Sequence, residues 1–186
     1  FRHIGLSHVK AFDEASYSFY RYTTPFLTDA WAHTWSLLCS QGFKSVPKGH
    51  FYDWRDFQFD SPIFRDESLS LRYEQSQGSG IRPNLTVEAI RADEPVCRVI
   101  VTSLEHFSGA PEAADVCYVD GFGTSEHERR KGIGRFVMLK ALQRMAEYGY
   151  RHVVRDADQN NFPAQLMYLG MGFKKRYSTY RMRKGL

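Results

Sequence analysis

Two glycines and several basic residues lie close together in the second half of the chain, where Arg129-Arg130-Lys131-Gly132-Ile133-Gly134-Arg135 opens an amphipathic segment. The first backbone N–H groups of a helix have no partner inside the helix, and the helix dipole favours negative charge at that end. Glycine at 132 and 134 keeps Cβ atoms away from an approaching ligand. The stretch therefore predicts a site for a phosphate or pyrophosphate group.

Two common phosphate-binding motifs do not fit this stretch. Gly134 is followed by Arg135, and the chain contains no Gly-Lys-Ser/Thr sequence, which excludes a P-loop. A dinucleotide fingerprint needs three spaced glycines after a tight strand–helix turn, and that pattern is also missing.

A second motif downstream narrows the class of phosphate-binding protein. Arg129-x-x-Gly132-x-Gly134 and, downstream, Asn161-x-x-Ala164-x-x-x-Tyr168-x-x-x-Gly172-Phe173 occur in this order with a short strand pattern between them. Together they resemble the two signature motifs of the GNAT superfamily of N-acetyltransferases, over about residues 85–186. The resemblance implies an α/β fold with a mixed, mostly antiparallel, splayed central sheet flanked by helices.

The resemblance also implies acetyl-CoA, or another acyl-CoA, as co-substrate. Amides from Arg129 to Gly134 are expected to hold its pyrophosphate, with added positive charge from basic side chains. Strand backbone near Phe122 and Thr124 and the side chain of Asn161 are expected to contact the pantetheine arm. The expected acyl-CoA residues are Phe122, Gly123, Thr124, Arg129, Arg130, Lys131, Gly132, Ile133, Gly134, Arg135 and Asn161.

The implied chemistry is direct attack of a neutral amine on a thioester. The departing thiolate needs a proton, and the resemblance assigns the acid role to Tyr168; the alternative role is an aromatic core residue. Asp120 shares strand parity with Tyr118 and Phe122, so all three are expected on one face, with Asp120 as the base. A carboxylate in a turn or ion pair is the alternative for Asp120, and Glu105 and His106 are rival bases.

The hydrophobic pattern predicts the elements around these residues. Leu85–Ile90 and Val96–Leu104 form a hairpin, Val116–Phe122 is a third strand, and the helix at Gly132–Tyr148 ends at Gly149. A strand at His152–Arg155, a helix at Phe162–Leu169 and a strand at Phe173–Met182 complete the second half. Ala30–Cys39 reads as a helix that stops at Gly42, whereas 47–60 (strand or packed loop) and 61–77 (helix or strand) stay open.

Gly78-Ser79-Gly80 is a candidate boundary between an aromatic-rich segment, 1–80, and an acyl-CoA-binding core, 81–186. The first segment holds all three tryptophans and supplies acceptor-side helices, or it is the tail of a preceding repeat. The repeat is suggested by Leu37–Lys44, which lines up with Met167–Lys174 at an offset of 130 residues (173 − 43), about one domain of this type.

Composition limits the function further. The chain of 186 residues, 42% hydrophobic, fits one globular domain, and it lacks an apolar run long enough to span a bilayer. Three cysteines without metal-ligand spacing predict reduced core thiols, no metal site and a cytoplasmic protein. A net charge of +4 permits a nucleic-acid-binding domain, but this is the weakest alternative, because the basic residues at 129–135 already have an expected anionic ligand and no nucleic-acid motif accompanies them.

Three functions are therefore carried forward. The first is an N-acyltransferase acting on a small-molecule or peptide amine. The second is a catalytically silent CoA-binding module, and the third is the nucleic-acid-binding domain. The acceptor and the oligomeric state, including a homodimer, are left open.

Overall fold

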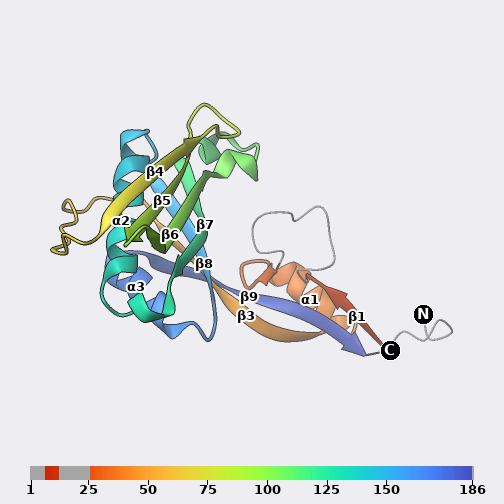
Figure 1. Cartoon of the computed structure of the whole chain (residues 1–186). Coiled ribbons are helices and arrows are strands. Elements are labelled where there is room, and N and C mark those ends of the chain that lie inside the picture. The colour runs from red at the N-terminus through yellow and green to blue at the C-terminus, as the bar shows by residue number, and fades with distance from the viewer. Residues whose placement is uncertain (1–6, 13–25, 186) are drawn as a thin grey trace. The chain divides into compact units, whose positions relative to one another are not determined.

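The computed structural model describes residues 7–12 and 26–185, so part of the aromatic-rich segment, including Ser16–Phe19, lies outside the described residues. The chain divides into two compact units. One unit comprises residues 53–155, and the other combines residues up to 52 with residues from 156 onward. Figure 1 labels the helices and strands of both units.

The unit of residues 53–155 is built on an antiparallel meander. Strands β4 (Ser70–Ser76), β5 (Asn84–Arg91), β6 (Glu94–Ser103) and β7 (Val116–Thr124) pair in chain order. Strand β8 (His152–Asp158, whose last three residues belong to the other unit) then pairs with β7 in parallel through residues 152–154. The mixed, mostly antiparallel sheet confirms the predicted fold class, and the open choice at 61–77 is settled as a strand.

One helix covers one face of this meander. Helix α2 (Ile133–Glu147) runs along β5, β6 and β7 and buries the side chains of Val137, Leu142 and Met145 completely (Figure 1). On the sheet, Val87 and Val99 are equally buried. Burying each of these side chains contributes about 1.5–3 kcal/mol, so packing of α2 on the sheet stabilises the unit.

The connections between strands follow local sequence preferences. The predicted hairpin is confirmed, with a two-residue turn at Ala92–Asp93 in which both residues have positive φ, 49° and 63°. Positive φ at both central positions matches the right-handed twist of the flanking strands. Gly78-Ser79-Gly80 lies in the connection between β4 and β5. The connection between β6 and β7 contains two short 3-10 helices, Leu104–His106 and Pro111–Asp115.

The other unit contains the remaining elements. They are β1 (His8–Ala11), β2 (Leu27–Thr28), α1 (Ala32–Ser40), β3 (Lys44–Trp54, whose last two residues belong to the first-described unit), α3 (Phe162–Met171) and β9 (Lys174–Gly185). Both β1 and β2 pair with β9 in antiparallel register. The helices and strands predicted here are confirmed to within a few residues, and the open stretch 47–60 is a strand as far as Trp54.

The two helices of this unit end in the same way. In α1, Gly42 has φ +81°, its N–H donates to Cys39 O at 2.9 Å, and the N–H of Phe43 donates to Leu38 O at 3.0 Å. In α3, Gly172 has φ +116°, its N–H donates to Leu169 O at 3.2 Å, and the N–H of Phe173 donates to Tyr168 O at 3.1 Å. The sequence similarity at an offset of 130 residues is thus matched, bond for bond, by the structure.

The cysteines correct one expectation. Cys97 and Cys117 are buried free thiols, but Cys39 on α1 is exposed and is not a core residue. Burial raises the pKa of the Cys117 thiol far above its usual range. Among the residues that the structure describes, neither a group of metal-ligating side chains nor a helix suited to crossing a membrane is found.

Candidate functional site

The segment before α2 adopts an unusual backbone path. Arg130 and Gly132 both have positive φ, 63° and 83°, and the first helical hydrogen bond runs from Phe136 N–H to Gly132 O at 3.0 Å. The amides of Gly132 to Arg135 therefore precede the first bonded turn. Arg129 differs from them, since its N–H donates to Glu126 O at 3.3 Å, so its amide is already used and the expected amide cradle begins after it.

The two glycines have separate structural reasons. Gly132 caps α2 in the left-handed region, which costs an L-residue about 1 kcal/mol or more. At Gly134, a Cβ would lie 2.9 Å from the Phe122 ring and 3.0 Å from Thr124 Oγ1. The start of α2 thus packs directly against the end of β7, which brings the expected phosphate and pantetheine segments together.

The residues around the glycines divide into buried and exposed ones. The Ile133 side chain is completely buried and anchors the first turn, whereas Arg130, Lys131 and Arg135 are exposed. Positive side chains and helix-start amides thus occur on one short segment, as a pyrophosphate site requires.

Strand β7 contains a β-bulge that sequence parity did not predict. Ile100 lies opposite Gly121 and Val101 lies opposite Val119, so Asp120 is an extra residue without an opposite partner. Phe122 pairs with Val99 on the face covered by α2, whereas Tyr118 lies opposite Thr102 on the other face. The expectation that Tyr118, Asp120 and Phe122 share a face is wrong, because one inserted residue reverses the alternation.

Near its end, strand β7 directs some of its backbone N–H and C=O groups toward β6 and others away from it. Ser125 N–H donates to Val96 O at 2.8 Å, and every second pair along an antiparallel ladder bonds in this way. The alternation turns the N–H and C=O groups of Phe122 and Thr124 outward, while those of Gly123 point toward β6. Thr124 O accepts a bond from Arg129 Nε at 3.1 Å, so Arg129 contributes its side chain to the shape of the loop.

The partner strand follows β7 for only three pairs. The parallel register runs from Val116 opposite His152 to Tyr118 opposite Val154. Beyond it, the guanidinium of Arg155 donates to the carbonyls of Val119 and Asp120, at 2.5 and 3.1 Å. A side chain therefore replaces the ladder where the two backbones part, next to the exposed side chain of Asp120.

The other two predicted residues lie on α3, in the other unit. Asn161 is the N-cap of α3, and its Oδ1 accepts a hydrogen bond from Ala164 N–H at 3.3 Å. Because Oδ1 caps the helix, the expected contact with the pantetheine arm falls to its Nδ2 group. Tyr168 is 1% exposed, with its ring centroid 5.8 Å from that of Tyr52 and 5.5 Å from that of Phe173. Burial, together with the neighbouring Tyr168, raises the pKa of Tyr52.

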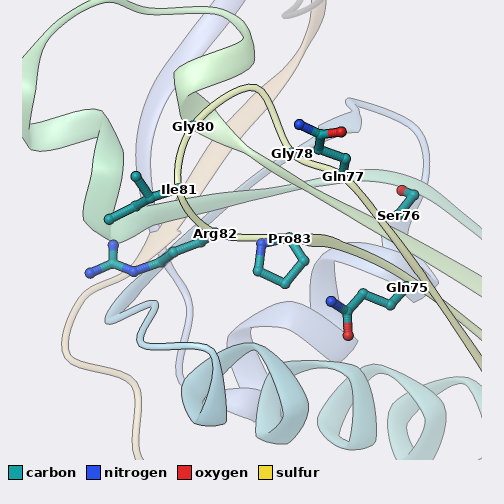
Figure 2. A pocket seen from close by; sticks show the side chains of 8 residues that line it. All are labelled: Gln75, Ser76, Gln77, Gly78, Gly80, Ile81, Arg82 and Pro83. Carbon is teal, nitrogen blue, oxygen red and sulfur yellow. The ribbon is translucent and has the colours of Figure 1, made fainter.

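A hollow of about 430 Å³ lies elsewhere in the unit of residues 53–155 (Figure 2). All of its lining residues belong to the end of β4 and the β4–β5 connection: Gln75, Ser76, Gln77, Gly78, Gly80, Ile81, Arg82 and Pro83. None of them is an expected acyl-CoA residue, and the guanidinium of Arg82 is held by Asp115 at 2.8 Å. The hollow is therefore formed by the connection between β4 and β5 and is separate from the expected acyl-CoA residues.

The sequence did not identify Arg91 and Arg155 as residues that contact the segments of the candidate site. Arg91 lies before a hairpin turn, where a solvated arginine is the ordinary expectation, and Arg155 ends a short strand pattern. Their partners come from segments distant in the chain, and no spacing rule connects them.

Comparisons with known proteins agree with the fold. The sequence model of the acetyltransferase (GNAT) family matches residues 31–173, further toward the N-terminus than the motifs reach. No curated protein sequence matches the chain. Among solved structures, a GCN5-related N-acetyltransferase from Kribbella flavida is similar at 17% identity and a TM-score of 0.60, over 84% of this chain and 64% of the other.

Two further structures are similar at low identity. A GCN5-related N-acetyltransferase from Sphaerobacter thermophilus has 13% identity and a TM-score of 0.63, over 86% of this chain and 58% of the other. A tandem GNAT protein from the clavulanic acid biosynthesis pathway has 11% identity and a TM-score of 0.66, over 99% of this chain and 66% of the other. The chain thus spans less than two thirds of the length of these structures.

Proposed function

The chain belongs to the GNAT acetyltransferase family, and we propose that it transfers an acetyl or other acyl group from CoA to a primary amine. The observation that carries the proposal is the packing of the α2 start against the end of β7. Helix-start amides and basic side chains lie beside an outward strand edge at Phe122, and Gly134 permits the close approach. This combination suits a ligand that has a pyrophosphate followed by an amide-containing arm.

In the proposed reaction, the lone pair of a neutral amine attacks the thioester carbonyl, and the C–S bond breaks as the tetrahedral intermediate collapses. The amine loses a proton, for which Asp120 is the proposed acceptor, directly or through water. The thiolate gains a proton, for which Tyr168 is the proposed donor. An outward N–H of β7 is the proposed donor to the oxyanion.

Two measurements test the proposal. Acetyl-CoA at about 100 times its Kd stabilises a folded protein by about 2.7 kcal/mol, so we expect a higher melting temperature in its presence. A thiol-release assay across a panel of primary amines then measures turnover. If neither binding nor turnover is detected, the proposal is wrong; binding without turnover on any amine favours a catalytically silent CoA module instead.

For the organisation of the chain, we propose that α1 and β3 are the tail of a preceding copy of the fold. The matched helix endings at Gly42 and Gly172 support this proposal. The similarity to a tandem GNAT protein over 99% of this chain supports it independently. Leu38 stands where Tyr168 stands in the second copy, so the proposed acid belongs to the second copy.

A further inference from the structure

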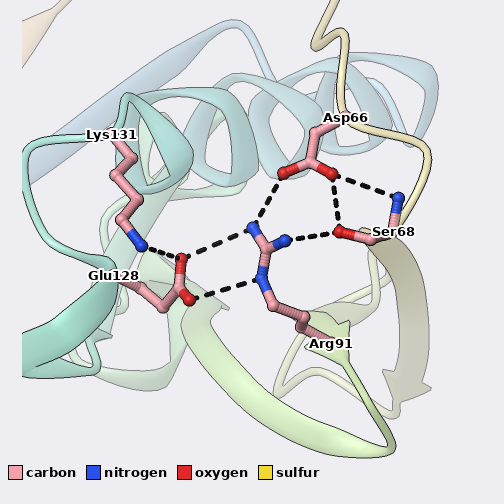
Figure 3. Close-up of polar contacts among 5 residues, drawn as sticks. All are labelled: Asp66, Ser68, Arg91, Glu128 and Lys131. Atoms are coloured by element: carbon pink, nitrogen blue, oxygen red, sulfur yellow. Dashed lines mark hydrogen bonds and ion pairs between the residues drawn. The ribbon is translucent and has the colours of Figure 1, made fainter.

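Arg91, the last residue of β5, joins three segments through its guanidinium (Figure 3). Its Nη2 donates to Asp66 Oδ2 at 2.8 Å and to Glu128 Oε2 at 3.4 Å, and its Nη1 donates to Ser68 Oγ. Its Nε lies 3.3 Å from Glu128 Oε1. Lys131 Nζ also donates to Glu128 Oε2, at 3.3 Å. Arg91 and Lys131 thus hold the same carboxylate.

The far side of the guanidinium is fixed by Asp66. Asp66 Oδ1 accepts the N–H of Ser68 at 3.1 Å and its hydroxyl at 2.6 Å. These bonds, with the neighbouring Arg91, lower the pKa of Asp66 to about 2. The segment carrying Asp66 is itself held on α2, where Phe64 stacks on Phe136 with ring centroids 5.1 Å apart. The position of Arg91 is therefore set from two directions.

Glu128 is the residue that needs this arrangement. It lies directly before the Arg129–Arg135 segment, and its side chain is only 13% exposed. A carboxylate in this place repels the phosphates that the segment is proposed to bind, and water screens a mostly buried charge poorly. The guanidinium of Arg91, which Glu128 shares with Asp66, reduces that repulsion and leaves the ammonium of Lys131 less fully committed to Glu128.

We propose that Arg91 is a positioning residue for the acyl-CoA site. Arg91 acts by neutralising Glu128 and by holding the Glu128 carboxylate to the β5 side of the phosphate segment. The inference rests on the proposed function, since it deepens the description of the same site. It adds Arg91, Asp66 and Glu128 to the residues that decide how strongly the pyrophosphate binds.

A merely structural role for Arg91 predicts different effects of the variants on CoA binding. If Arg91 only ties the segment 64–68 to β5, its loss weakens CoA binding whether or not Glu128 is charged. If Arg91 neutralises Glu128, the loss is repaired when the charge of Glu128 is also removed. The double variant therefore separates the two roles.

The experiment measures the Kd for CoA by calorimetry, together with melting temperature, for the whole chain and its variants. We expect Arg91→Met to weaken CoA binding about tenfold, and Arg91→Met with Glu128→Gln to restore the Kd to within about threefold of the original. Glu128→Gln alone is expected to keep or improve the affinity. The matched control is Arg72→Met, which removes another arginine–glutamate pair, Arg72 Nε to Glu88 Oε2 at 3.0 Å, away from α2, and leaves the Kd unchanged.

The outcomes distinguish the inference from the function it rests on. If the original chain does not bind CoA, the proposed function fails. If CoA binds but Arg91→Met has the original Kd, or the double variant binds as weakly as the single one at equal melting temperature, the inference about Arg91 is wrong. If Arg91→Met does not fold, the comparison of Glu128→Gln with the original decides, and weaker binding by Glu128→Gln overturns the inference.

Discussion

Tyr168 is the single residue on which the proposed chemistry depends most. Its phenol is buried and contacts the rings of Tyr52 and Phe173, so its hydroxyl is removed from bulk water. We expect Tyr168→Phe to leave the Kd for acetyl-CoA nearly unchanged and to lower kcat about 100-fold, which is the usual contribution of a general acid. The measurements are calorimetric binding and thiol release under saturating substrates.

The control for this change is Tyr177→Phe, because Tyr177 is a tyrosine on β9 that is 42% exposed. It is expected to retain full turnover. If the Tyr168→Phe variant turns over at the original rate, Tyr168 is not the general acid and its role is that of a core aromatic residue.

Single residues also mark where sequence reasoning ended. The glycines of the phosphate segment were recognisable by type and spacing, because Gly132 forms a left-handed cap that few residues tolerate and Gly134 leaves room for a close approach. The position of Asp120 was not, because a β-bulge is set by the pairing of two strands and leaves no periodic signal in either one. Arg91 and Glu128 were not paired in advance either, since 37 positions separate them in the chain.

At the scale of elements, the contact between α2 and β7 decides whether the site exists. A Cβ at Gly134 would lie 2.9 Å from an atom of the Phe122 ring, so either the helix start or the ring must move. We expect Gly134→Ala to lower the free energy of unfolding by roughly 1–3 kcal/mol, as overpacking does, and to weaken acetyl-CoA binding. Chemical denaturation and calorimetry measure the two effects.

A matched control is available on α3. A Cβ at Gly170 meets nothing within 4 Å, so Gly170→Ala is expected to keep or raise stability by up to about 1 kcal/mol through helix propensity. If Gly134→Ala is as stable as Gly170→Ala and binds acetyl-CoA normally, close packing of α2 on β7 is not a requirement of the site.

At the same scale, most elements were predictable because their hydrophobic patterns are strong. The hairpin of β5 and β6 and the helix α2 follow from β-branched runs and from a 3.6-residue period. The stretch that contains β4 was left open, because the alternation of Leu69, Leu71 and Tyr73 is short and a helix led by Pro62 was an equal alternative. Its identity as a strand comes from pairing with β5, which is a tertiary property.

At the scale of the whole molecule, the same helix ending is built twice, 130 residues apart. An L-residue at the positive φ of Gly42 or Gly172 costs about 1–2 kcal/mol. Because both glycines make the same capping bonds, we expect Gly42→Ala and Gly172→Ala to lower the free energy of unfolding by similar amounts in this range, whereas Gly170→Ala does not. Denaturant unfolding of the three variants checks this. A cost at Gly172 without one at Gly42 would mean that the first ending does not stabilise the fold as the second does, and the proposed repeat would lose its structural support.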